Sequence, residues 1–141
     1  MVKKQIILIL SFIILLSSCT LTTEQPNLIK GIWAYSAPSY SSPTESYSFN
    51  DKMEYTHITT KIENGSQVLD KEYTGTYTMS YNSFEVVKAS GVITLKGQSD
   101  GSTENKTFNF TFETKPYANI RSLTLTNKNG TIVYGYSGDA V

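Results

Sequence analysis

The sequence predicts an all-β domain that forms an eight-stranded antiparallel up-and-down barrel, with a two-sheet β-sandwich as the alternative. Apolar and polar residues alternate with a period of two in successive runs along the chain. Tyrosine, with ten residues, and threonine are abundant, and both favour the pleated surface of a sheet. No amphipathic helix pattern follows Cys19. Closure into a barrel would leave no strand edge exposed, which favours it over an open sheet.

We expect eight strands. Their predicted ranges are 31–37, 45–50, 53–62, 67–80, 84–96, 105–114, 120–127 and 131–137. The alternation is clearest in the sixth run, where Phe108, Phe110 and Phe112 share one face. One buried and one solvated face is typical of antiparallel sheets. Within 84–96 the apolar phase shifts around Gly91, which predicts a bulge or a sharp bend there.

Turn residues mark the connections between these strands. Short hairpin turns, rich in Asn and Gly, are predicted at 50–52, 64–65, 82–83 and 129–130. Longer loops are predicted at 98–104 and 115–119. The Ser- and Tyr-rich segment at 38–43 is the longest irregular connection.

The first 18 residues have the layout of a secretory signal. The basic residues Lys3 and Lys4 precede an apolar run at 6–16, which is 11 residues long. A helix of that length reaches only about 16 Å, roughly half of a hydrocarbon core. We therefore expect a signal helix that is removed, and not a permanent membrane span.

The segment Leu16-Ser17-Ser18-Cys19 closes this apolar run and resembles the lipobox of bacterial lipoproteins. The resemblance implies that signal peptidase II frees Cys19, which carries a diacylglyceryl group and becomes the first residue of the mature chain. Two or three acyl chains make such anchoring effectively permanent. It also implies a bacterial cell-envelope location. Thr20 stands where an Asp would resemble an inner-membrane retention signal, which favours the outer membrane.

These features divide the chain into three predicted segments. Residues 1–18 are the lipoprotein signal peptide, residues 19–30 are the lipidated cysteine with a flexible tether, and residues 31–141 are the barrel domain. The tether is polar and shows no periodicity. Cys19 is the only cysteine, so the domain must be stabilised by packing and backbone pairing without a disulfide.

Composition argues against several classes of function. Of the 12 basic residues, Lys3 and Lys4 lie in the signal segment, so ten remain against 12 acidic residues. The lysines are scattered between acidic residues, and we expect no nucleic-acid partner. The sequence has no Gly-rich phosphate loop, nucleophile elbow or Ser/His/Asp order. We therefore expect no enzyme and no cofactor.

Few residues offer the chemistry of a site. His57 is the sole histidine, and its spacing from Glu54 places the two on opposite strand faces. We expect His57 to be an exposed strand residue, and no metal site, because no Cys or further His accompanies it. Asp70 and Glu72 share a strand face, as paired catalytic carboxylates would, but nothing else marks them. We interpret them as a solvated face.

The start of the first predicted strand, Gly31-x-Trp33, resembles the start of lipocalin-type barrels. The segments GTYT at 75–78 and LTLT at 123–126 resemble recurring strands of small bacterial lipocalin-like domains. The resemblance covers nearly the whole domain and implies a barrel in which Trp33, beside Gly31, plugs one end. The chain lacks the Thr-Asp-Tyr motif, the late helix and the late arginine of true lipocalins. Ligand transport is therefore not carried over.

Two functional hypotheses follow, both for a membrane-anchored monomer. The first is a binding module for a small apolar or amphipathic ligand, since an eight-stranded interior is either filled by side chains or holds one small ligand. The second is an interaction factor, either a recognition protein or an enzyme inhibitor, or else a structural envelope protein. Its candidate surface comprises Tyr35, Tyr40 and Tyr117, because exposed aromatic residues anchor protein partners.

Overall fold

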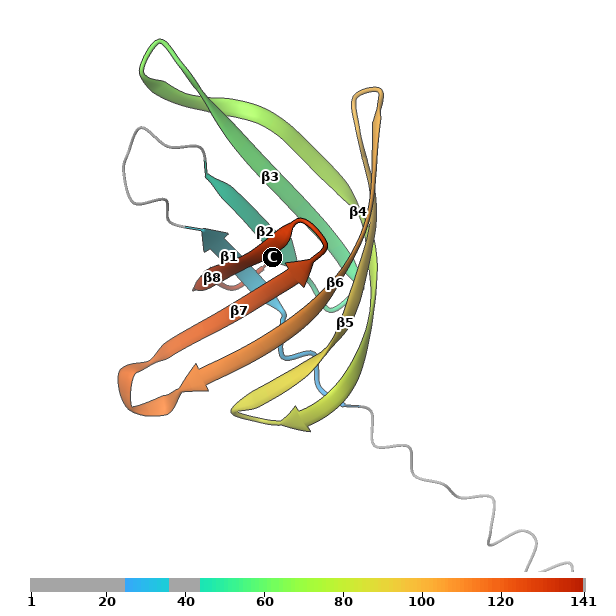
Figure 1. Ribbon diagram of the computed structural model, residues 1–141, viewed down its shortest axis with the longest axis vertical. Coiled ribbons are helices and arrows are strands. Elements are labelled where there is room, and N and C mark those ends of the chain that lie inside the picture. Colours follow the sequence, from blue (N-terminus) through green and yellow to red (C-terminus); the bar gives the residue numbers. More distant parts are fainter. Residues whose placement is uncertain (1–24, 36–43, 141) are drawn as a thin grey trace, which may run out of the picture.

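The computed structural model describes residues 25–35 and 44–140, which form a closed eight-stranded barrel (Figure 1). The strands follow the chain order around the barrel, each antiparallel to its neighbours, and β1 pairs with β8 to close it. This confirms the up-and-down barrel over the β-sandwich. The predicted signal helix, Cys19 with its lipobox, and Tyr40 lie outside the described residues.

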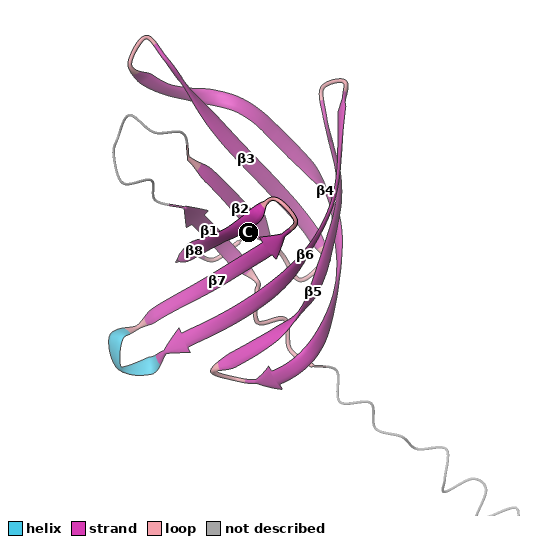
Figure 2. Cartoon of the chain, viewed as in Figure 1, coloured by secondary structure: helices cyan, strands magenta, loops and turns pink. Residues whose placement is uncertain are grey.

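Strands account for almost all of the described chain (Figure 2). They are β1 (Gly31–Tyr35), β2 (Glu45–Phe49), β3 (Glu54–Glu63), β4 (Ser66–Glu85), β5 (Lys88–Ser99), β6 (Ser102–Lys115), β7 (Ile120–Asn127) and β8 (Gly130–Gly138). A 3-10 helix, η1 (Pro116–Ala118), lies between β6 and β7. Within the described ranges, no helix has the length and apolar character that a membrane crossing requires.

The barrel has two distinct ends. We call the end where the described chain begins, at Gln25, the tether end; it lies toward the bottom of Figure 1 and carries the β2–β3, β4–β5 and β6–β7 connections. The opposite end, which we call the distal end, carries the β3–β4, β5–β6 and β7–β8 turns. The β3–β4 and β5–β6 hairpins project farthest in this direction.

These two hairpins extend past their neighbours. The β4–β5 ladder starts at Thr74↔Gln98, so residues 69–73 of β4 pair only with β3. The β6–β7 ladder starts at Asn109↔Thr126, so residues 102–108 of β6 pair only with β5. Among the described residues, two stretches of strand edge are therefore unpaired at the distal end.

Large side chains fill the interior. The buried core comprises Ile29, Trp33, Tyr47, Phe49, Tyr55, Tyr77, Ile93, Leu95, Phe108, Phe110, Phe112, Leu123, Leu125 and Tyr134. Most of them occupy alternate positions of their strands, as the period of two requires. Full burial of one such aliphatic or phenyl side chain contributes about 1.5–3 kcal/mol.

The largest departure from the predicted strands is in β4. A hairpin turn was predicted at 82–83, which is wrong: β4 continues to Glu85, and the turn follows at 86–87. The ladder with β5 shifts register between Tyr81 and Ser83, opposite Gly91, so the predicted irregularity lies on the partner strand. A Cβ at Gly91 would lie 1.9 Å from the Ser80 carbonyl oxygen, which explains the glycine.

Two other segments differ from the predictions. The expected long loop at 98–104 is a tight turn at Asp100 and Gly101, where Gly101 has a φ of 68°. The end of the expected tether packs onto the barrel, because Ile29 is fully buried and Tyr81 donates a hydrogen bond to the Pro26 carbonyl oxygen at 2.9 Å. Residues 26–29 therefore pack against the barrel, whose first strand starts at Gly31.

Candidate functional site

His57 lies inside the barrel and is only 1 % exposed, so the prediction of an exposed histidine is wrong. In β3 the inward positions are Tyr55 and His57, whereas Glu54 is exposed. The spacing had correctly placed Glu54 and His57 on opposite faces. Which face points inward is decided by Tyr55, whose aromatic ring belongs in the core.

Two glutamates hold the imidazole of His57. Its Nδ1 lies 2.7 Å from Glu104 Oε2, and its Nε2 lies 2.7 Å from Glu45 Oε1. Ionised carboxylates only accept hydrogen bonds, so both ring nitrogens donate and the ring is an imidazolium. The partners come from three strands, β2, β3 and β6, which barrel closure brings together.

The electrostatics of this group agree with its geometry. Burial by itself lowers the pKa of His57, but the hydrogen bonds to Glu104 and Glu45 outweigh burial and raise that pKa above its ordinary value. Burial likewise raises the pKa of each glutamate and is the largest single effect, but the hydrogen bond and charge of His57, together with the tyrosine hydroxyls, outweigh it, so both carboxyl pKa values are lowered. Lys106 Nζ lies 3.5 Å from Glu104 Oε2 and balances the second negative charge.

Three tyrosine hydroxyls complete the hydrogen bonding of the glutamates. Tyr47 and Tyr134 donate to Glu45 at 3.1 and 3.0 Å, and Tyr55 donates to Glu104 at 3.2 Å. Burial raises the pKa of all three phenols, followed by the effect of the nearby carboxylates, which keeps the hydroxyls protonated as donors. We call these six residues, including His57, the His57 cluster.

Aromatic rings cover both faces of the imidazolium. Tyr47, His57 and Tyr73 are register partners on β2, β3 and β4. The His57 ring lies 4.2 Å from the Tyr47 ring, with planes 8° apart, and 5.8 Å from the Tyr73 ring, with planes 18° apart. A cation between two aromatic faces is stabilised by their quadrupoles.

The His57 cluster has the properties of a structural ion network. Both nitrogens of His57 are engaged with carboxylates, so neither is free to take a proton from a substrate. The side chains of His57 and Glu104 are 2 % exposed, and that of Glu45 is 23 % exposed. Within the described part of the chain, no group of three or more His, Cys, Asp or Glu side chains is arranged to hold a metal ion.

At the tether end, Trp33 is fully buried and donates from Nε1 to the Ile29 carbonyl oxygen at 2.7 Å. Its ring makes edge contacts with Phe112 at 6.1 Å and with Tyr136 at 5.4 Å. The Arg121 guanidinium lies 4.7 Å from the Tyr136 ring centre, so the chain's arginine reaches Trp33 through a tyrosine. A Cβ at Gly31, whose φ is 133°, would lie 2.5 Å from the Tyr136 ring.

The tyrosines of the candidate interaction surface do not come together. Tyr35 ends β1 at the distal end and is about one-third exposed. Tyr117 lies in η1 at the tether end and is fully exposed. Tyr40 is outside the described residues, so the two described tyrosines lie at opposite ends of the barrel.

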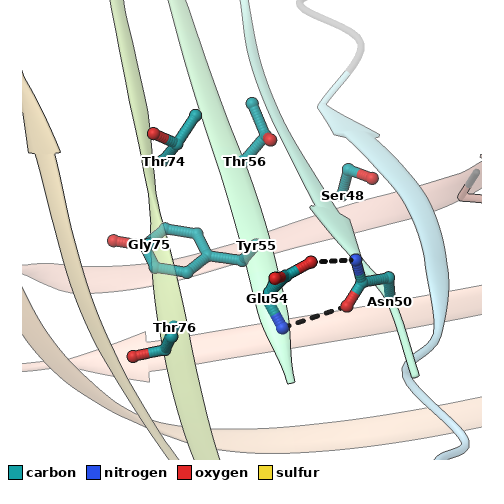
Figure 3. A pocket seen from close by; sticks show the side chains of 8 residues that line it. All are labelled: Ser48, Asn50, Glu54, Tyr55, Thr56, Thr74, Gly75 and Thr76. Atoms are coloured by element: carbon teal, nitrogen blue, oxygen red, sulfur yellow. Dashed lines mark hydrogen bonds between the residues drawn. The ribbon is translucent and has the colours of Figure 1, made fainter. Parts of the chain in front are cut away.

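A shallow groove of about 400 Å³ lies on the outer face of β2, β3 and β4 (Figure 3). Hydroxyl groups of Ser48, Thr56, Thr74 and Thr76 line it. At its lower end, Asn50 donates to Glu54 Oε2 at 2.9 Å and accepts from the Glu54 backbone N–H at 3.0 Å. These polar groups satisfy one another around the β2–β3 turn, and the groove is open to solvent.

Two larger notches flank the β5–β6 hairpin at the distal end. The first, of about 760 Å³, lies between the free edge of β4 at 69–72 and the β5–β6 turn at 98–102. Its acidic residues Asp70, Glu72 and Asp100 outnumber its one basic residue, Lys71. The second, of about 550 Å³, lies between the free edge of β6 at 105–108 and residues 126–129 of the β7–β8 hairpin.

Asp70 and Glu72 are both exposed, and both line the first notch. The β3–β4 register shifts between Thr59 and Thr60, so Asp70 is an extra residue, a bulge, in β4. Bulges and charges on a strand edge prevent indiscriminate pairing with other strands.

In comparisons with known proteins, no family model, no curated protein and no solved structure matches this chain. The function therefore has to be inferred from the residues and their geometry.

Proposed function

We propose that this chain is a lipid-anchored protein of the bacterial cell envelope that binds a protein partner through the distal end of its barrel. The lipobox-like segment Leu16–Cys19 supports the anchor, with the outer membrane favoured by Thr20. A non-catalytic role is part of this proposal, and it is supported by the carboxylates that hold both nitrogens of His57.

The observation that carries this proposal is the free edge of β4 beside the first notch. A partner segment in extended conformation would pair with residues 69–73 of β4 and add a strand to the sheet. Leu69, 58 % exposed, supplies an apolar contact at this edge. Three acidic residues against one lysine favour a partner segment that carries basic side chains.

The filled interior favours this function over ligand transport. The core side chains and the His57 cluster together occupy the inside of the barrel. A small apolar ligand inside the barrel would have to displace aromatic rings or approach buried charges. The closed eight-stranded barrel itself keeps that ligand as the second candidate.

Site-specific photocrosslinking in cells tests the partner. We expect a photoreactive phenylalanine analogue at Leu69 to crosslink one discrete protein. The same analogue at Val133, an equally exposed position on the outer wall of β8, should crosslink none. The double charge reversal Asp70→Lys and Glu72→Lys should abolish the Leu69 crosslink. The absence of a protein crosslink at Leu69, with a small molecule retained by the purified barrel in native mass spectrometry, would favour the ligand hypothesis.

The lipid anchor has its own test. A Cys19→Ala chain should remain an unprocessed precursor and lose fatty-acid label. If Cys19→Ala is processed and remains bound to membranes, the anchor assignment is wrong, whatever the crosslinking shows.

A further inference from the structure

Four apolar side chains are exposed on adjacent connections at the tether end. Val86 and Val87 form the β4–β5 turn and are 70 % and 45 % exposed. Tyr117 lies in the β6–β7 connection and is fully exposed, and Ile120, the first residue of β7, is 54 % exposed. The Thr114 N–H donates to the Val87 carbonyl oxygen at 2.8 Å, which joins the end of β6 to the β4–β5 turn. We call these four side chains the tether-end patch.

The chain reaches the barrel beside this patch. Val86 and Leu28 line one surface cavity of about 570 Å³. Pro26 is bound by the hydroxyl of Tyr81, which also accepts a hydrogen bond from the Leu28 N–H. Only six residues, 20–25, follow Cys19 up to the start of the described chain. Even fully extended, they span at most about 20 Å.

We propose that the tether-end patch is a membrane-docking face, which inserts into the interface of the bilayer that holds the lipid on Cys19. The inference rests on the proposed lipid anchor and adds the orientation of the barrel. Tyrosine prefers the interface, where its ring is apolar and its hydroxyl stays wet. Contact with the bilayer would remove from water the apolar side chains that the fold leaves exposed.

The reach of the tether excludes the inverted orientation. β6 has 14 residues and extends about 45 Å along its path. With a strand tilt of about 40°, the barrel is about 35 Å tall. A 20 Å tether therefore cannot place the distal turns on the bilayer while Gln25 is at the far end. The first notch consequently faces away from the membrane, where a protein partner can reach it.

Charges around the patch indicate which kind of contact holds it. Four basic side chains are offset by four acidic ones, namely Lys30, Lys88, Lys115, Arg121, Asp51, Glu85, Glu113 and Asp139. Attraction to anionic lipid needs an excess of basic residues, which is not found here among the described residues. Docking should therefore be as strong on phosphatidylcholine vesicles as on vesicles that contain phosphatidylglycerol.

Dye labels on the full lipidated chain test the orientation. Lys115 at the tether end and Lys128 in the β7–β8 turn are both exposed, and each would carry an environment-sensitive dye after Lys115→Cys or Lys128→Cys substitution. In phosphatidylcholine vesicles with nitroxide lipid, we expect the dye at position 115 to shift to the blue and be quenched. The dye at position 128 should remain unquenched.

A matched pair of variants assigns the effect to the patch. Val86→Asp with Tyr117→Asp should abolish quenching at position 115, whereas Leu69→Asp with Val133→Asp, at equally exposed apolar positions outside the patch, should leave it unchanged. Equal quenching at both dye positions in a chain whose lipidated mass is verified would overturn the docking face and leave the anchor intact. Failure to find a lipidated mass would instead overturn the anchor in the proposed function.

Discussion

At the tether end Trp33 is held by rings and a backbone carbonyl, whereas toward the distal end His57 is held by two carboxylates and three phenols. Both side chains are almost completely buried in the same barrel. The Trp33 contacts involve no buried ionised group, so their stabilisation does not depend on pH. The His57 contacts require an imidazolium, with a proton on each ring nitrogen, and two ionised glutamates, so their stabilisation depends on pH.

The difference separates two contributions to the fold. Burial of Trp33 removes a large apolar surface from water at little electrostatic cost. Burial of His57 with Glu45 and Glu104 carries a desolvation penalty that the hydrogen bonds have to offset. The tether end is thus expected to supply most of the stability, and the His57 cluster to depend on every one of its partners.

The largest effect is expected from removing the tryptophan. Trp33→Ala should lower the free energy of unfolding by about 4 kcal/mol, because the cavity that it leaves is lined by rigid rings. Urea unfolding at pH 5.5 and at pH 8 should give the same loss. A loss of less than about 1 kcal/mol, or one that changes with pH, would contradict an apolar plug.

Removing the histidine should lower the free energy of unfolding somewhat less than removing the tryptophan. His57→Leu leaves two buried carboxylates facing one another and should lower the free energy of unfolding by about 3 kcal/mol, near the lower limit for such pairs because Glu45 is partly exposed. The same urea titrations measure it. Adding Glu45→Gln and Glu104→Gln should recover part of the loss; if the triple variant is the least stable, charge is not the cause.

A smaller loss of stability is expected at Gly97, whose missing side chain leaves space for Tyr55 of the His57 cluster. A Cβ at Gly97 would lie 2.3 Å from the Tyr55 hydroxyl oxygen and 3.0 Å from the Thr74 carbonyl oxygen. Gly97→Ala should therefore lower the free energy of unfolding by about 2 kcal/mol through overpacking. Thermal unfolding of a double-mutant cycle with Tyr55→Phe checks the cause, since the two substitutions should be clearly less than additive.

In the unmodified protein, the free energy of unfolding should depend on pH through the His57 cluster. The His57 pKa is raised from 6.5, so its contribution is complete below about pH 6.5 and is lost as pH rises through the folded-state value. The Glu45 and Glu104 pKa values are lowered from 4.5, so their contributions are complete above about pH 4.5 and are lost as pH falls through the folded-state values.

Stability measured by urea titration across pH should therefore be highest between about pH 4.5 and 6.5. In His57→Leu, the decline that His57 causes above this range should disappear. A decline of the same size in that variant would show that another group is responsible.

The smallest effect is expected at Arg121, on the exposed side of the Trp33 plug. Arg121→Gln removes the cation above the Tyr136 ring and should lower the free energy of unfolding by about 0.5 kcal/mol. Differential scanning calorimetry should resolve this change from Lys115→Gln, an exposed substitution with no ring contact among the described residues. If both variants shift the unfolding temperature equally, the contact between Arg121 and the Tyr136 ring does not contribute to stability.

Local patterns in the sequence predicted the strands better than the site. β7 has its predicted bounds of 120–127, because its alternation is uninterrupted between two clear turn signals. The turn predicted at 82–83 does not form, because β4 stays paired with β5 on both sides of this Asn-Ser dipeptide. The register shift there makes it a bulge within the strand. His57 was misplaced because its partners Glu45 and Glu104 are 12 and 47 residues away, beyond any local pattern.

The sequence by itself determined the all-β class, the number of strands and the residues that alternate, since these depend on neighbours one or two positions away. It also carries the lipobox-like segment, which the described residues do not include. Only the tertiary structure decided that β3 turns His57 inward, that β6 brings Glu104 to it, and that Tyr35 and Tyr117 lie at opposite ends. The physical reason is closure, because the register of eight strands around the barrel sets which distant side chains share its interior.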